Sequence, residues 1–74
     1  MADAEKFVMR PDFVKSRVAE IRRAKNDAEH AHGLEDELYE DVLRAIARGA
    51  CEDVAACCKA ALATKRMKFP RWTA

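Results

Sequence analysis

Residues 27–48 read DAEHAHGLEDELYEDVLRAIAR, and the spacing of their apolar side chains predicts one amphipathic helix. These side chains recur at about 100° per residue, so they fall on one side of the helix. Asp27 is a good N-cap, and Gly49 is a natural stop. Gly33 weakens a helix by about 1 kcal/mol relative to alanine. We expect it inside a continuous helix; the alternative is a break after residues 27–32.

Glu35 stands in the middle of the apolar face of this helix. A buried charge needs a partner, because the burial of an isolated charge is too costly. Arg17 occupies a similar position on the preceding helix, and His32 lies one turn before Glu35. We therefore expect a structural clasp in which Arg17, His32 and Glu35 hold the first two helices together.

Two more helices are expected, one on each side of this segment. Residues 11–26 begin with Pro11, which fits a first helical turn because its missing N–H costs nothing there. Residues 51–64 place small apolar side chains on one inward face: Val54, Cys58, Ala61 and Leu62. The sequence therefore predicts an all-α protein, a compact three-helix domain (about 11–26, 27–48 and 51–64) with the C-terminal segment packed back across the helices.

The 74 residues are expected to form a single domain, 1–74. A chain of this size buries only about 60% of the surface that its unfolded form exposes, so its stability margin is thin. Residues 1–10 are mixed in character and predict a loosely ordered N-terminal segment. Residues 65–74 contain Pro70 and no periodicity, which predicts an irregular tail.

The tail carries large apolar side chains that would be unusual in a solvated segment. We expect Phe69 or Trp72 to dock on this domain or on a second subunit. Phe69, Arg71 and Trp72 are therefore the candidate partner-binding residues. The small-residue face of residues 51–64 is a second candidate contact, and either surface would suit a homodimer.

The net charge of +1 hides a strong separation of charge along the chain. Residues 11–26 carry five basic and two acidic side chains, whereas residues 27–48 carry two arginines and seven acidic side chains. Residues 65–74 carry four basic side chains. This pattern favours charge complementarity inside the domain over a dedicated polyanion surface.

No arrangement of residues points to catalysis, so we expect no enzyme activity and no cofactor. His32 and Glu35 have the spacing at which two helical side chains share a metal ion, but such a site needs further ligands from other helices. Acid–base chemistry by the same pair has no other support in the sequence. Ser16 is the only serine and lies on a predicted helix, and no glycine-rich phosphate loop is present. The three cysteines lack the paired Cys-x-x-Cys elements of zinc sites.

The odd number of cysteines and the lack of a signal peptide predict a reducing, cytoplasmic location. Cys51 and Cys58 are expected to face inward as small apolar side chains. No run of residues is long or apolar enough to span a membrane, so we expect no membrane association.

Nucleic-acid binding is the alternative function. Arg22, Arg23, Lys25 and the basic tail could form one patch, with Trp72 available for stacking. The acidic second helix would repel phosphate, however, unless it faced away. In addition, the alanine-rich residues 51–64 lack the side chains with which a recognition helix reads base edges.

Residues 27–38 have the pattern D-x-E-x-A-H-x-x-E-D-x-L, and residues 69–72 form an aromatic-x-Arg-Trp ending. In these features the chain, over residues 13–74, resembles a group of small, uncharacterised bacterial and phage-encoded helical proteins. The resemblance implies a joint role, in a clasp or a binding surface, for five residues: His32, Glu35, Asp36, Arg71 and Trp72.

Taken together, these features predict a non-catalytic, small protein-interaction or accessory protein of bacterial or phage origin. It would act by binding a protein partner or itself. Small size, an aromatic tail and separated charges favour association over catalysis.

Overall fold

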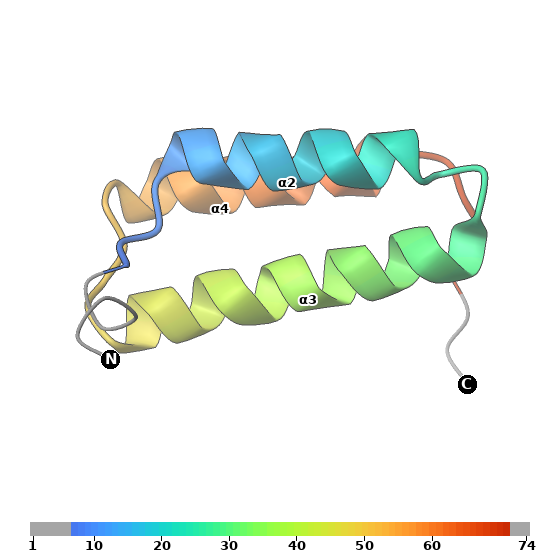
Figure 1. Ribbon diagram of the computed structural model, residues 1–74. Coiled ribbons are helices and arrows are strands. Elements are labelled where there is room, and N and C mark those ends of the chain that lie inside the picture. Colours follow the sequence, from blue (N-terminus) through green and yellow to red (C-terminus); the bar gives the residue numbers. More distant parts are fainter. Residues whose placement is uncertain (1–6, 72–74) are drawn as a thin grey trace.

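The computed structural model describes residues 7–71 and consists of three α-helices and a short 3₁₀ helix (Figure 1). Helix α2 spans Pro11–Arg23, α3 spans Ala28–Ala47, α4 spans Val54–Leu62, and the 3₁₀ helix η1 spans Ala63–Arg66. Helices α2 and α4 lie side by side, and α3 packs against both of them. The predicted all-α three-helix domain is confirmed. In the described part of the chain, no helix has the length and apolar character needed to cross a membrane.

Helix α3 agrees closely with the sequence expectation. The Asp27 carboxylate caps it by accepting a hydrogen bond from the His30 backbone N–H at 3.3 Å. Gly33 lies inside one continuous helix. The helix ends before Gly49, whose φ of +72° is a left-handed conformation that glycine adopts without strain.

Helix α2 ends at Arg23, earlier than the predicted end near residue 26. A tight turn closes it, because the Ala24 N–H donates to the carbonyls of Glu20 and Ile21 at 3.2 and 3.0 Å. The short connection that follows returns the chain as α3, which runs antiparallel to α2 (Figure 1).

The core lies between the three helices and is built from one apolar stripe on each. Its buried helical side chains are Val14, Val18 and Ile21 on α2, Ala31, Leu38, Val42 and Ala45 on α3, and Cys57 and Ala61 on α4. Segments outside the helices complete the core with the buried side chains of Met9, Met67 and Phe69.

Helix α4 is shorter than the predicted residues 51–64 and turns a different face inward. It begins after Asp53, which has a left-handed φ of +58°. Cys57 is buried, whereas Val54 and Leu62 are 44% and 57% exposed. Of the predicted inward stripe, Ala61 is buried as expected, Cys58 is half-buried, and the prediction is wrong for Val54 and Leu62. Small side chains let α4 approach its neighbours closely, and the larger ones are left at the surface.

Residues 7–10 are anchored to the domain. Met9 is 1% exposed, and its backbone pairs with the segment that precedes α4. The Met9 N–H donates to the Ala50 carbonyl at 2.9 Å, and the Glu52 N–H donates to the Met9 carbonyl at 2.8 Å. The prediction of a loosely ordered N-terminal segment is wrong for these residues, because a buried methionine holds them. Residues 1–6 lie outside the described part of the chain.

Candidate functional site

An ion pair between a buried carboxylate and a half-buried guanidinium joins α3 to the C-terminal segment. Glu35 is 1% exposed in the middle of α3. Nε of Arg71 donates to Glu35 Oε1 at 2.8 Å, and Nη2 of Arg71 donates to Oε2 at 3.0 Å. Such a bidentate pair is among the strong charge-assisted hydrogen bonds of proteins. The prediction that Glu35 is buried with a charged partner is confirmed, but the partner is Arg71.

The other N–H groups of Arg71 gather the chain around its guanidinium. Nη2 also donates to the Thr64 carbonyl at 2.8 Å, and Nη1 donates to the carbonyls of Met67 and Phe69 at 3.3 and 3.4 Å. The centroid of the Phe69 ring lies 3.9 Å from Cζ of the guanidinium. We call this arrangement, centred on Glu35 and Arg71, the Arg71 clamp. It fixes the C-terminal segment on the helices, and the prediction that this segment packs back is confirmed.

Tyr39 and Thr64 complete the polar network around the Glu35 carboxylate. The Tyr39 hydroxyl shares a hydrogen bond with Oγ1 of Thr64 and donates to Glu35 Oε2 at 3.5 Å. Burial raises the pKa of Tyr39, and the nearby Glu35 charge adds to that effect. Within residues 7–71, every buried side-chain nitrogen and oxygen has a hydrogen-bond partner. The network is therefore internally satisfied.

The charge of Glu35 is stabilised in the folded protein. Burial by itself raises the pKa of Glu35, but the hydrogen bonds and the positive charge of Arg71 outweigh it, and the pKa lies below its ordinary value. An ionised carboxylate that is bound through both oxygens has no proton to donate. The pairing of both carboxylate oxygens with Arg71 supports a structural role for Glu35.

The lowered pKa of Glu35 predicts a loss of stability in acid. The ion pair contributes fully above the unfolded-state pKa of about 4.3, and its contribution is lost as the pH falls through the lower folded-state pKa. Urea unfolding should show a stability advantage of the wild type over Glu35→Gln that is constant above about pH 5 and shrinks below about pH 4. The difference isolates Glu35, since both proteins share all other carboxylates. An advantage that grew on acidification would contradict the ionised state of Glu35.

Arg17 and His32 take no part in the Arg71 clamp. Nη1 of Arg17 lies 3.1 Å from Oδ2 of Asp41, and Nε2 of His32 lies 3.6 Å from Oδ2 of Asp36. The predicted structural clasp of Arg17, His32 and Glu35 is therefore wrong. Arg17 meets the later part of α3, where Asp41 lies. Glu35 lies instead beside η1 and the C-terminal segment.

The candidate partner-binding residues of the tail are used inside the domain. Phe69 is buried, and the Arg71 guanidinium is bound to Glu35. The prediction that Phe69 docks on this domain is confirmed. The core and the clamp hold these two side chains, and their predicted binding of a partner stays a prediction. Trp72 lies outside the described residues.

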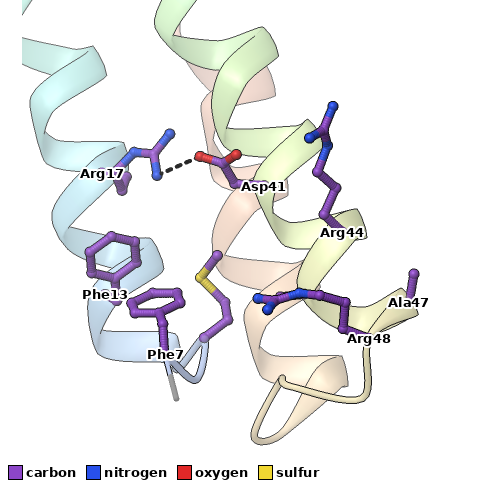
Figure 2. Close-up of a pocket in the computed structure, with 9 residues that line it drawn as sticks. Phe7, Phe13, Arg17, Asp41, Arg44, Ala47 and Arg48 are labelled. Carbon is purple, nitrogen blue, oxygen red and sulfur yellow. Dashed lines mark ion pairs between the residues drawn. The ribbon is translucent and has the colours of Figure 1, made fainter. Parts of the chain in front are cut away.

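A pocket of about 580 Å³ lies between the start of α2 and the end of α3. Two aromatic rings and three guanidinium groups line it: Phe7, Phe13, Arg17, Arg44 and Arg48. We call it the arginine–aromatic pocket. Figure 2 shows the two rings on the α2 side of the pocket and the side chains of Arg44 and Arg48 on the α3 side.

The apolar part of this pocket combines exposed rings with a buried floor. Phe7 and Phe13 are 40% and 39% exposed, and their ring centroids lie 5.1 Å apart in an edge-to-face contact. Cζ of Arg17 lies 5.7 Å from the centroid of the Phe13 ring. Met9 and Ala45 are fully buried beneath the pocket. An apolar side chain of a ligand would therefore meet apolar surface.

The charges of the arginine–aromatic pocket are only partly compensated. Arg17 pairs with Asp41, and Arg44 pairs with Glu40. No carboxylate of the described residues lies within ion-pair distance of Arg48. Its guanidinium is directed toward the Phe7 side of the pocket (Figure 2). One uncompensated positive charge thus lies beside two exposed rings.

The sequence did not predict the arginine–aromatic pocket. Arg44 and Arg48 have an i, i+4 spacing, which was a visible signal for a shared face of a helix. Their proximity to Phe7 depends on the anchored N-terminal segment, which the sequence predicts to be loosely ordered.

A second, smaller hollow of about 280 Å³ lies between α3 and α4 and has only Tyr39, Val42, Leu43, Cys58, Ala61 and Leu62 as its lining. Leu43 is 65% exposed at its edge. Cys58 and Leu62 were expected in the core. They lie here because α4 turns the face that carries them toward the surface. We call this hollow the α3–α4 groove.

All three cysteines are free thiols. Cys57 is buried, and Cys51 and Cys58 are half-buried. Cys51 packs against the core as predicted, whereas Cys58 lines the α3–α4 groove, which corrects its predicted inward position. Burial raises the pKa of Cys57 to about 11, and its thiol donates to the Glu52 carbonyl at 3.4 Å. A thiol with a raised pKa is a poor nucleophile.

In the part of the chain that the structure describes, no group of three His, Cys, Asp or Glu side chains is arranged to hold a metal ion.

Comparisons with known protein families, with curated proteins and with solved structures found no match for this chain. The resemblance to small bacterial and phage-encoded proteins therefore stays a prediction.

Proposed function

We propose that the protein is a small, non-catalytic interaction protein that binds a partner protein at the arginine–aromatic pocket. The observation that carries the proposal is the presence of exposed Phe7 and Phe13 beside the uncompensated charge of Arg48. Aromatic and arginine side chains are enriched among the residues that dominate binding energy at interfaces. The partner segment that fits the pocket presents an apolar side chain next to a carboxylate.

Each part of the pocket supports one element of this partner. The rings of Phe7 and Phe13 would cover an apolar side chain, and full burial of such a side chain contributes about 1.5–3 kcal/mol. Arg48 is free to form two parallel hydrogen bonds with a carboxylate. Asp41 holds Arg17 beside the Phe13 ring, so this wall of the pocket is already ordered before a partner binds.

The proposal includes the bacterial or phage origin and the cytoplasmic location that the sequence predicts. The resemblance described above supports a bacterial or phage origin, and free thiols support a reducing cytoplasm. A homodimer is the alternative form of the same function, in which a second copy of the chain would fill the pocket.

The proposal predicts that the pocket binds an acidic, apolar peptide. We expect the peptide acetyl-Leu-Asp-Leu-Glu-amide to shift the NMR signals of Phe7, Phe13 and Arg48, and its basic twin, acetyl-Leu-Lys-Leu-Arg-amide, to leave them unchanged. Arg48→Glu should weaken binding of the acidic peptide about tenfold or more, because a hydrogen bond to a charged group contributes about 1.5–3 kcal/mol.

The matched control for Arg48→Glu is Lys15→Glu. Lys15 is exposed on α2 outside the pocket, and its replacement changes the net charge by the same amount. An equal loss of binding in both variants would mean that net charge alone attracts the peptide. Light scattering tests the homodimer: a dimer that Arg48→Glu dissociates would place a second copy in the pocket and overturn the separate-partner proposal.

A further inference from the structure

Six basic side chains from two distant segments gather at one end of the molecule. They are Arg22, Arg23 and Lys25, at and after the end of α2, and Lys65, Arg66 and Lys68, in and after η1. Helix α2 contacts η1, and Figure 1 shows the end of α2 and the end of the α4–η1 segment on the same side of the molecule. All six residues are exposed. We call this cluster the basic end; it lies at the opposite end of α2 from the arginine–aromatic pocket.

The basic end keeps its charge, because the acidic residues of the domain do not neutralise it. None of the six cations lies within ion-pair distance of a carboxylate in the described residues. The carboxylates near these cations are fewer: Glu20, Asp27, which caps α3, Glu29, and the buried Glu35, which is already bound by Arg71. The predicted charge complementarity among the two basic segments and the acidic second helix is limited, in the described residues, to two ion pairs, Arg17 with Asp41 and Arg71 with Glu35.

The exposed acidic residues in the middle of α3 point away from the core. The buried stripe of α3 includes Ala31, Leu38 and Val42, and the exposed carboxylates Glu37 and Glu40 lie on the opposite side of the helix. Helix α3 forms one side of the molecule, and α2 and α4 form the other (Figure 1). The exposed carboxylates of α3, which would repel phosphate, therefore lie on the side of the molecule that α3 forms.

We propose that the basic end binds the phosphate backbone of nucleic acid. The cluster offers many long, exposed cations, and the described pockets lie elsewhere on the surface. A ligand must therefore be held by its negative charge. A nucleic-acid backbone carries one such charge at every nucleotide. A membrane surface fits less well, because the two large apolar side chains that follow η1 in the described residues, Met67 and Phe69, are buried. Phosphate contacts position a protein but carry no sequence information, so binding is independent of base sequence.

Fluorescence anisotropy with a labelled DNA duplex tests this proposal. With a duplex of about 20 base pairs, the logarithm of the affinity should fall with the logarithm of the salt concentration with a slope of about −5 if all six cations contact phosphates. Arg22→Gln/Arg23→Gln should reduce the magnitude of this slope by about 2 and weaken binding about tenfold or more in low salt. Circular dichroism shows whether this exposed double variant keeps its helices.

A second variant and a matched control separate the basic end from net charge. Lys65→Gln/Lys68→Gln removes two cations of the other segment and should weaken binding to a similar degree. Arg44→Gln/Arg48→Gln makes the same change of net charge near the opposite end of the domain. We expect that control to retain the wild-type affinity within about twofold.

Three outcomes would overturn the proposal. They are the absence of salt-dependent binding to duplex and single-stranded DNA, an equal loss of affinity in the Arg44→Gln/Arg48→Gln control, and tighter binding of polyglutamate or of phosphatidylserine vesicles than of DNA. The peptide-binding pocket is tested separately, because its variants lie outside the basic end. Failure of one proposal is therefore distinguishable from failure of the other.

Discussion

Arg71→Ala is expected to lower the free energy of unfolding by about 3–5 kcal/mol, because it leaves the charge of Glu35 buried without a partner. The substitution also removes the donors to the carbonyls of Thr64, Met67 and Phe69. Small domains have a total stability of about 5–15 kcal/mol, so the loss takes a large share of it. Urea unfolding followed by circular dichroism measures the effect.

Two other variants make the Arg71→Ala experiment specific. Arg44→Ala breaks an exposed ion pair with Glu40 and should cost about 0.5 kcal/mol or less. Arg71→Lys keeps the positive charge but loses the bidentate contact. Its loss of unfolding free energy should therefore lie between those of Arg44→Ala and Arg71→Ala. If Arg71→Ala is unfolded, the Arg71→Lys variant still tests the clamp. A loss below about 1 kcal/mol in Arg71→Ala would contradict the clamp.

Met9→Ala is expected to cost about 2–5 kcal/mol, the range of large-to-small substitutions in a core. Met9 is fully buried although it precedes the first described helix. Its burial also holds the backbone hydrogen bonds to Ala50 and Glu52. Thermal or urea unfolding measures the loss.

The control for Met9→Ala is the neighbouring Val8→Ala. Val8 is only half-buried, so its truncation should cost less than about 1 kcal/mol. Equal losses in the two variants would mean that the N-terminal segment contributes no specific side chain to the core. Since Met9 also lies beneath the arginine–aromatic pocket, Met9→Ala should weaken binding of the acidic peptide as well.

The sequence predicted the parts of the fold that depend on local rules. The long helix α3 follows from an apolar repeat, a capping aspartate at Asp27 and a glycine at Gly49, and each of these acts within a few residues. The burial of Glu35 followed from its place on the apolar face. These features need no knowledge of which other segment lies opposite.

The wrong predictions concern contacts between distant segments. Arg17 and Arg71 were both available to Glu35, and the relative positions of α2 and α3 decide between them. The inward face of α4 depends on how closely it approaches its neighbours, and Met9 depends on pairing with Cys51 across the chain. The arginine–aromatic pocket was missed for the same reason, since Phe7 and Arg48 are brought together only by the folded chain.

The Arg71 clamp has a consequence for folding during synthesis. A ribosome produces the Glu35 carboxylate long before it produces the guanidinium that neutralises it. Until then, docking of α3 requires protonation of that acid, and otherwise the acid stays in water and keeps this face of α3 undocked. Both options oppose docking of the helices. We therefore expect a nascent chain that stops after η1 to remain sensitive to protease, and resistance to begin once residues up to Arg71 have left the exit tunnel.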